Sequence, residues 1–351
     1  MQLIYFYEDK RRKMDTKMKT KRIEWLDDTK GLGILLIMMA HVFQYFAALH
    51  GINDYICSFH VPIFFIAAGY LTGFRKPEKI SAARVKGLIV PYVIFSLINS
   101  AMKLGVLFLK KALTAEILKN EMVELLITGN GTVWFLLCLL FVELCYLGLV
   151  KTKIQNYGWL VIGLGLLVAV SVLDNGSIPL LVVLFRVIAG LGFYCIGYGM
   201  CSLHCEQKIK GWMAVVLLAA GIIVEIIFGS ELDFFNGNFG NLITMLICSI
   251  CSGAGYMFLL EKWEKADFGN VIKKVFSYFG KNSLIVMLIH PLLLQVVMYP
   301  LGSRIGQLQG VTSVLAGIVV YVGIVILEIP FIKVINGFFP FVLGKRKETA
   351  K

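Results

Sequence analysis

The chain has 351 residues, of which 58% are hydrophobic and only 16% are charged. This composition excludes an ordinary water-soluble domain, because a single core surrounded by water cannot bury so much apolar surface. The formal net charge of +12 would suit a nucleic-acid-binding protein, but the basic residues follow the loops between apolar stretches, so we expect no nucleic acid partner.

About ten apolar stretches, each roughly as long as the 17 to 25 residues of a membrane-spanning helix, follow one another along the chain. We therefore predict an all-α, polytopic membrane helix bundle with about ten transmembrane helices, located in the cell membrane. The predicted spans are 31–49, 55–74, 86–109, 132–150, 157–173, 179–200, 211–228, 239–260, 277–299 and 311–335.

The basic residues predict the orientation of the chain. If the N-terminus is cytoplasmic, 26 of the 34 Lys and Arg residues fall in cytoplasmic segments and only four fall in outer loops. Cytoplasmic loops are enriched in Lys and Arg, so both termini are predicted to be cytoplasmic. The expected organisation is a basic N-terminal tail at 1–21 that is attracted to anionic membrane lipids, a transmembrane domain at 22–343 and a basic C-terminal tail at 344–351.

The first predicted span combines an ammonium group and an imidazole on one helix face. Lys30 and His41 are 11 residues apart, so at about 100° per residue they project from the same side, roughly 16 Å apart along the axis. An ionisable side chain at this depth is costly and indicates function. A neutral imidazole can accept a hydroxyl proton. His41 is therefore a candidate catalytic base; the alternative is a histidine that only packs between helices.

Charged residues at the cytoplasmic ends of predicted spans are candidates for binding an anion. Asp27 and Asp28 precede the first span and could cap its helix, or Asp27 could instead orient Lys30. Lys281 stands at the start of the ninth predicted span, where helix amides and a cation favour phosphate.

Polar and aromatic side chains in other spans are candidates for the wall of a cavity. His60 and His290 each lie close to a proline, and each could contact an acceptor or have only a structural role. Trp134 could line a cavity or anchor the helix at the membrane interface. Glu143 and Arg186 would be costly if unpaired in lipid, so we expect them to face the interior, where they could pair with each other.

The eight cysteines do not indicate a disulfide framework, because they lie in or at the ends of the spans. Cys201, His204 and Cys205 could be metal ligands, but no fourth ligand is evident. We therefore predict no metal site.

Five blocks of sequence carry a family resemblance. The first is R-I-E-W-L-D-D-T-K-G at 22–31, followed by His41. The others are F-H-V-P-I-F-F-I-A-A-G-Y at 59–70, R-V-K-G-L-I-V-P-Y at 84–92, V-W-F-L at 133–136 and G-K-N-S-L-I-V-M-L-I-H-P at 280–291. In this order they resemble the acyltransferase-3 family of integral-membrane O-acyltransferases, and most of all its fucose 4-O-acetylase-like subgroup.

The resemblance implies an enzyme that moves an acetyl or other short acyl group from cytosolic acyl-CoA to a hydroxyl of a cell-surface or exported glycan or of a lipid-linked sugar. Acetyl-CoA or another acyl-CoA would be a co-substrate, and no bound cofactor is expected. His41 would be the catalytic residue. The expected donor-binding residues are Lys30, Asp27, Arg84, Lys86 and Lys281, and the expected acceptor or cavity residues are His60, Trp134, Glu143, Arg186 and His290.

Two functions of other classes remain open from the sequence. A polytopic carrier or flippase for a glycan or a lipid-linked precursor would also have many spans and buried charges. A membrane scaffold or sensor is the third alternative, although interior His, Glu and Arg side chains would be costly in it.

Overall fold

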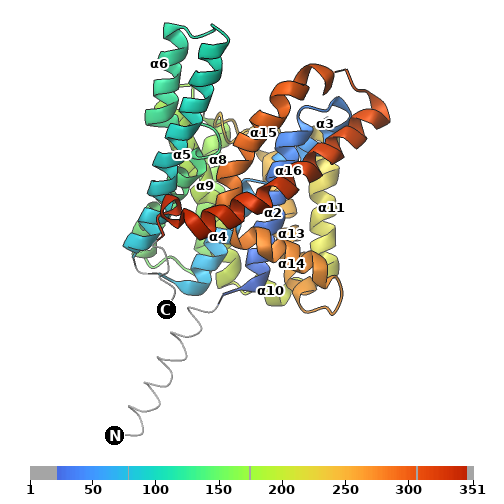
Figure 1. The fold of residues 1–351 in the computed structure, drawn as a ribbon. Helices are drawn as coiled ribbons and strands as arrows, with labels where there is room; N and C mark the ends of the chain where they lie inside the picture. The colour runs from blue at the N-terminus through green and yellow to red at the C-terminus, as the bar shows by residue number, and fades with distance from the viewer. Residues whose placement is uncertain (1–21, 78, 174, 306, 346–351) are drawn as a thin grey trace, which may run out of the picture.

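The computed structural model describes residues 22–77, 79–173, 175–305 and 307–345 (Figure 1). The predicted tail at 1–21 and residues 346–351 of the predicted C-terminal tail lie outside the described residues. Within the described ranges the fold is all-helical, as predicted, and β structure is limited to one isolated bridge between Asp233 and Asn238.

The helices follow the apolar stretches of the sequence, with short π-helical turns (η2, η3) and 3₁₀ turns (η1, η4) between them. In chain order they are α2 (Glu24–Phe43), η1 (Ala47–Leu49), α3 (His50–Cys57), α4 (Pro62–Arg75), α5 (Ala82–Leu109), α6 (Ala115–Val123), η2 (Glu124–Thr128), α7 (Trp134–Val150), α8 (Asn156–Val172), α9 (Pro179–Ser202), α10 (Cys205–Lys208), α11 (Gly211–Phe228), α12 (Leu242–Leu246), η3 (Ile247–Cys251), α13 (Ser252–Glu264), α14 (Asn270–Lys281), α15 (Ser283–Ile305), α16 (Gly310–Phe338) and η4 (Pro340–Leu343).

Seven helical segments are long and apolar enough to cross a membrane: Ala47–Arg75, Ala82–Leu109, Pro179–Ser202, Gly211–Phe228, Leu242–Glu264, Ser283–Gly302 and Gly310–Phe338. The helices α7 and α8 are apolar but have only 17 residues each. The helix α2 has 20 residues but carries Glu24, Asp27, Asp28 and Lys30 in its first half. The chain is therefore a multi-pass membrane protein with at least these seven candidate spans.

The first two predicted spans have different boundaries in the structure. The helix α2 ends at Phe43 and not near residue 49, and the Gln44 side-chain amide donates a hydrogen bond of 2.9 Å to the His41 carbonyl at this end. His41 thus lies in the last turn of α2. The second predicted span is interrupted between α3 and α4, where Pro62 starts the new helix, because proline lacks an N–H group and fits the first helical turn.

Helices in the centre of the bundle pack very closely through glycines. The helix α4 packs along α9, and α14 packs along the beginning of α2. A Cβ atom on Gly69 would lie 1.9 Å from the Tyr194 carbonyl oxygen, and one on Gly280 would lie 1.8 Å from the Asp27 carbonyl oxygen. Only a residue without a side chain permits such contact between helix backbones.

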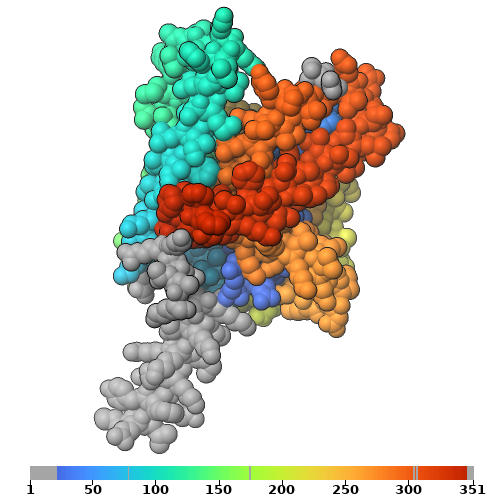
Figure 2. All heavy atoms as spheres, in the orientation of Figure 1, coloured from blue at the N-terminus to red at the C-terminus, as the bar shows by residue number. Residues whose placement is uncertain are grey.

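Two elements shape the outside of the molecule. The helices α5 and α6 form a hairpin that projects at the top of the view in Figure 1, where α6 runs beside α5. The two helices are joined by a hydrogen bond of 2.7 Å from Ser100 to Glu121 and by the ion pair between Lys103 and Glu121. The long helix α16 crosses the face shown in Figure 2 diagonally and packs on α2 and α15.

Candidate functional site: a cavity with a basic end and a histidine end

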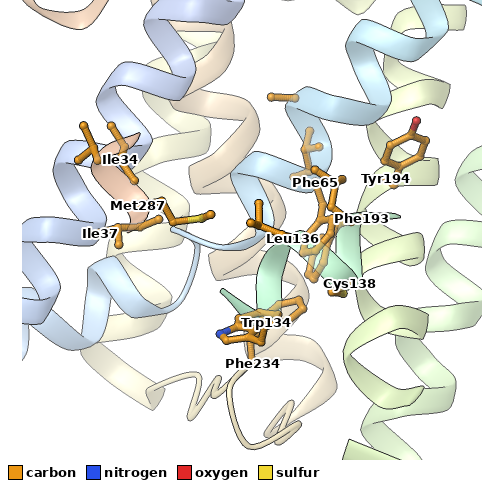
Figure 3. Close-up of a cluster of buried hydrophobic side chains, with 14 of the residues drawn as sticks. Ile34, Ile37, Phe65, Trp134, Leu136, Cys138, Phe193, Tyr194, Phe234 and Met287 are labelled. Carbon is orange, nitrogen blue, oxygen red and sulfur yellow. The ribbon is translucent and has the colours of Figure 1, made fainter. Parts of the chain in front are cut away.

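A cavity of about 1100 Å³ lies inside the bundle. Its walls come from α2, α4, α5, α7 and α15, together with Tyr194 of α9 and the loop that follows α11. Much of the lining is apolar and includes Ile34, Ile37, Met287 and Leu136. In the view of Figure 3, Met287 lies beside Ile37, and Leu136 lies beyond Met287. This size and this mixture of apolar walls with few polar groups are typical of a ligand site.

The helix α2 presents one continuous face to the cavity. Lys30, Ile34, Ile37, His41 and Gln44 all line it, and their spacing of three or four residues is that of one helix face. The expected shared face of Lys30 and His41 is thus present. At 1.5 Å per residue, the two side chains lie roughly 16 Å apart along the axis, one toward each end of the cavity.

We call the region lined by Lys30, Arg75, Lys79 and Arg84 the basic end. Arg75 ends α4, Lys79 lies in the connection to α5, and Arg84 lies in the first turn of α5. Lys30 is close enough to interact electrostatically with Arg75 and Arg84. Glu143 of α7 holds Arg84: the Nη2–Oε1 distance is 2.5 Å, and Nε lies 3.1 and 3.2 Å from the two carboxylate oxygens.

The basic end contains some of the predicted donor residues and lacks others. Arg75 and Lys79 were not predicted, although Arg75 lies four residues after Leu71 on the cavity-lining face of α4. Lys86 is exposed and does not line the cavity. It is two positions after Arg84, and side chains two positions apart on a helix point about 200° away from each other. Lys281 does not line it either: this residue ends α14, and the next helix, α15, begins two residues later at Ser283, which does line the cavity.

Asp27 does not cap α2, because the helix starts at Glu24 with Ile23 as the residue before it. Asp28 likewise lies inside the helix, four residues after its first residue. The Asp27 carboxylate forms ion pairs with Arg22 and with Lys30, whose Nζ lies 3.6 Å away. Asp27 is buried and does not line the cavity. Of the two roles left open by the sequence, this geometry fits the orientation of Lys30.

We call the region lined by His41, Gln44, Cys57, His60 and Asp233 the histidine end. The His60 ring Nδ1 lies 3.0 Å from the Ile56 carbonyl oxygen. A carbonyl only accepts hydrogen bonds, so Nδ1 carries the hydrogen and Nε2 is the free acceptor.

His290 lies directly behind His41. The centres of the two rings are 5.3 Å apart at an angle of 34°. The His290 Nδ1 lies 2.7 Å from the Val286 carbonyl oxygen, and its Nε2 is buried without a hydrogen-bond partner in the described part of the chain. His290 does not line the cavity itself, and its ring contacts the ring of His41, which does.

Glu143 and Arg186 do not pair with each other. Glu143 binds Arg84 at the basic end, whereas the buried Arg186 donates hydrogen bonds to the backbone carbonyls of Thr128 (2.5 Å), Phe234 (3.2 Å) and Phe235. The pair that the sequence left open is not formed, because each of the two charged groups has other partners: Arg84 for Glu143, and three backbone carbonyls for Arg186.

Trp134 lines the cavity near the histidine end, beside Phe234 (Figure 3). The Arg186 guanidinium carbon lies 4.9 Å from the centre of the Trp134 ring, within the range of a cation–π interaction.

In the part of the chain that the structure describes, no group of three or more His, Cys, Asp or Glu side chains is arranged as metal ligands would be. Cys201 and Cys205 are free thiols, and the His204 ring lies 3.6 Å from a Glu206 carboxylate oxygen.

The comparisons with known proteins give one match. The family model Acyl_transf_3, described as an acyltransferase domain, matches residues 23–333. No curated protein and no solved structure matches the chain. The matched range includes every residue of both ends of the cavity.

Proposed function

Because the chain belongs to the acyltransferase-3 family, we propose that this membrane acyltransferase moves an acetyl or other short acyl group from acyl-CoA to a hydroxyl of a cell-surface or exported glycan, as in the fucose 4-O-acetylase-like subgroup. The observation that carries the proposal is that Lys30 and His41 line a single cavity from one face of α2. In the proposed topology α2, α7 and α8 also cross the cell membrane, giving ten spans with both termini in the cytoplasm.

The proposed donor site is the basic end of the cavity, which faces the cytosol in this topology. Acyl-CoA carries several phosphate charges, and Lys30, Arg75, Lys79 and Arg84 supply four cations there. Arginine binds phosphate through paired N–H groups and lysine binds it as a compact charge. The pantetheine arm of the donor then extends along the apolar walls formed by Ile34 and Ile37 and brings the thioester toward His41.

The proposed reaction takes place at the histidine end. The His41 imidazole accepts the proton of the acceptor hydroxyl, and the hydroxyl oxygen attacks the thioester carbonyl. The carbon–sulfur bond breaks, and the CoA thiolate leaves and takes up a proton to become the free thiol. A route through an acyl-histidine would use the same residue as nucleophile.

The test is acyl transfer from labelled acetyl-CoA by the purified full-length protein, with membranes of the producing cell as the source of acceptor. We expect His41→Ala to lower transfer about 10²- to 10⁴-fold, the usual contribution of a general base. The control is His204→Asn, because His204 is exposed and lies outside the cavity.

Normal turnover by the His41→Ala variant would remove the proposed base. Movement of a glycan or a lipid-linked sugar across the membrane without consumption of thioester would favour the carrier or flippase instead. Mass analysis of the surface polysaccharide of a deletion strain would identify the acyl group and the acceptor.

A further inference from the structure

The charges that line the cavity are separated along its length. Among the described residues, the charged side chains in the lining are Lys30, Arg75, Lys79 and Arg84, with Glu143 beside Arg84, and Asp233. The first five lie at the basic end. Asp233 lies at the histidine end, where it is close enough to Cys57 and His60 to interact with them electrostatically.

The loop that carries Asp233 is held rigidly. The Asp233 backbone N–H and C=O exchange hydrogen bonds of 2.8 and 2.9 Å with Asn238, which closes a tight turn. Gly237 in this turn has φ of +67°, a conformation that glycine adopts without strain. The Asn175 side-chain amide donates to the Gly237 carbonyl at 2.8 Å. The position of the carboxylate is therefore fixed before any substrate binds.

Arg186 fixes the same loop from behind. Its guanidinium donates to the carbonyls of Phe234 and Phe235 and is covered by the rings of Trp134 and Phe235, whose centres lie 4.9 and 5.1 Å from the guanidinium carbon. Arg186 does not line the cavity. Three of its five N–H groups donate to carbonyls, and the guanidinium is close enough to Asp233 to interact with it electrostatically. Since Asp233 lines the cavity and Arg186 does not, a molecule in the cavity contacts the carboxylate.

The Asp233 carboxylate keeps free capacity to bind. Its Oδ1 accepts from the Asn236 backbone N–H at 3.1 Å and its Oδ2 from the Asn236 side-chain amide at 2.6 Å. A carboxylate offers about four acceptor positions, so about two remain. In the described part of the chain, no Lys, Arg or His forms an ion pair with Asp233.

We propose that Asp233 is a specificity-determining residue of the acceptor subsite, and that this subsite takes a neutral or amine-bearing polyol and rejects an anionic one. Two hydroxyls of a polyol donate to the free acceptor positions of the carboxylate, and the rings of Trp134 and Phe235 give its C–H face an apolar surface. An acceptor with a carboxylate or phosphate of its own meets repulsion there. This inference rests on the proposed function, but its electrostatic part can be tested without any enzymatic activity.

The first experiment uses the Cys57 thiol, which lines the same end of the cavity, in the purified full-length protein. Its rates of modification by cationic 2-(trimethylammonium)ethyl methanethiosulfonate and by anionic 2-sulfonatoethyl methanethiosulfonate are measured by mass spectrometry of the Cys57 peptide. We expect Asp233→Asn to lower the cationic-to-anionic rate ratio about fivefold or more, since one unit charge near the thiol is removed. The control, Glu231→Gln, removes an exposed acid outside the cavity and leaves the ratio unchanged.

An unchanged ratio in Asp233→Asn overturns the proposal. If Cys57 does not react, the same measurement is made on Gln44→Cys in a Cys57→Ser background, because Gln44 also lines this end. A lack of reaction at both positions means that acceptor-sized molecules do not enter the histidine end, and this result also overturns the proposal.

The second experiment compares p-nitrophenyl β-glucoside and p-nitrophenyl β-glucuronide as inhibitors of the transfer from labelled acetyl-CoA. The two sugars differ only at C6, which is a neutral CH2OH group in the glucoside and a carboxylate in the glucuronide. We expect the glucoside to inhibit at about tenfold lower concentration than the glucuronide, and Asp233→Asn to reduce this preference severalfold. A preference unaffected by Asp233→Asn contradicts the subsite. If the unmodified protein shows no acyl transfer that depends on His41, the proposed function is contradicted instead. The thiol measurement then still tests the charge of the cavity.

Discussion

The Arg84 guanidinium is oriented before any substrate arrives, because Glu143 accepts hydrogen bonds from both its Nε and its Nη2. The paired geometry directs the remaining N–H groups of Arg84 into the basic end of the cavity. Lys86 is two residues farther along α5 and points away from the cavity, so the two cations form a natural pair for comparison.

We predict that Arg84→Gln raises the KM for acyl-CoA about 10- to 150-fold, since one charge-assisted hydrogen bond to phosphate is worth about 1.5 to 3 kcal/mol. Lys86→Gln should leave KM within about twofold of the unmodified protein. The measurement is steady-state transfer at varied acyl-CoA concentration. Equal effects of the two substitutions would mean that the donor does not bind inside the cavity.

At the scale of elements, the contact between α14 and α2 positions the basic end. Gly280 of α14 lies against the Asp27 carbonyl, and Asp27 in turn holds Lys30. A displacement of α14 would therefore change both the stability of the bundle and the place of the Lys30 ammonium group.

We predict that Gly280→Ala destabilises the protein by about 1 to 3 kcal/mol, the usual cost of overpacking, and raises the KM for acyl-CoA. The control is Gly323→Ala in α16, where an added Cβ would meet nothing within 4 Å. The measurement is the apparent Tm in detergent together with steady-state transfer. An unaltered Tm for Gly280→Ala would contradict the tight contact between the two helices.

The hairpin of α5 and α6 contains a pH-sensitive contact. Burial alone would raise the pKa of the Glu121 carboxyl, but hydrogen bonds from Lys103 and Ser100 lower it below the usual range of a glutamate. A carboxyl whose pKa is lowered in the folded state adds stability above its ordinary pKa, and this stability is lost as the pH falls through the lowered value.

We therefore predict that hydrogen exchange of residues 115–123, corrected for intrinsic rates, accelerates when the pH falls below the ordinary glutamate range of about 4.3. Glu121→Gln should show the faster exchange already at neutral pH, whereas Glu116→Gln, an exposed acid in the same helix, should behave like the unmodified protein. A hairpin whose exchange is independent of both pH and Glu121 would refute the role of this ion pair.

At the scale of the whole molecule, the proposed orientation places the basic end of the cavity in the cytosol, where acyl-CoA is made. We predict that alkaline phosphatase fused after Ala112 is active, because it is exported, and that a fusion after Lys153 is inactive. A fluorescent protein at the C-terminus should be fluorescent. The reverse pattern would place the basic end on the outside and exclude cytosolic acyl-CoA as the donor.

Composition and helical periodicity were sufficient to predict the helical class and the common face of Lys30 and His41, since both depend on local rules. The same periodicity could have predicted that the Arg84 and Lys86 side chains point in different directions from their helix, so that only one of them lines the cavity. The end of α2 at Phe43 was missed because the apolar run continues to Leu49 and hides the turn. Asp233 could not be found, because its loop has no repeating pattern and is held by Asn175 and Arg186, which are distant in sequence.

The termination of α2 two residues after His41 has a chemical consequence. The last carbonyl groups of a helix carry a partial negative charge that stabilises a nearby cation by about 0.3 to 1 kcal/mol, and by up to about 2 kcal/mol in a partly buried position. In the proposed reaction the imidazole becomes an imidazolium while the thioester is attacked. The carbonyl groups at the end of α2 therefore offset part of the free energy needed to create that charge within a lipid-embedded bundle. A histidine in the middle of a continuous helix would lack this stabilisation.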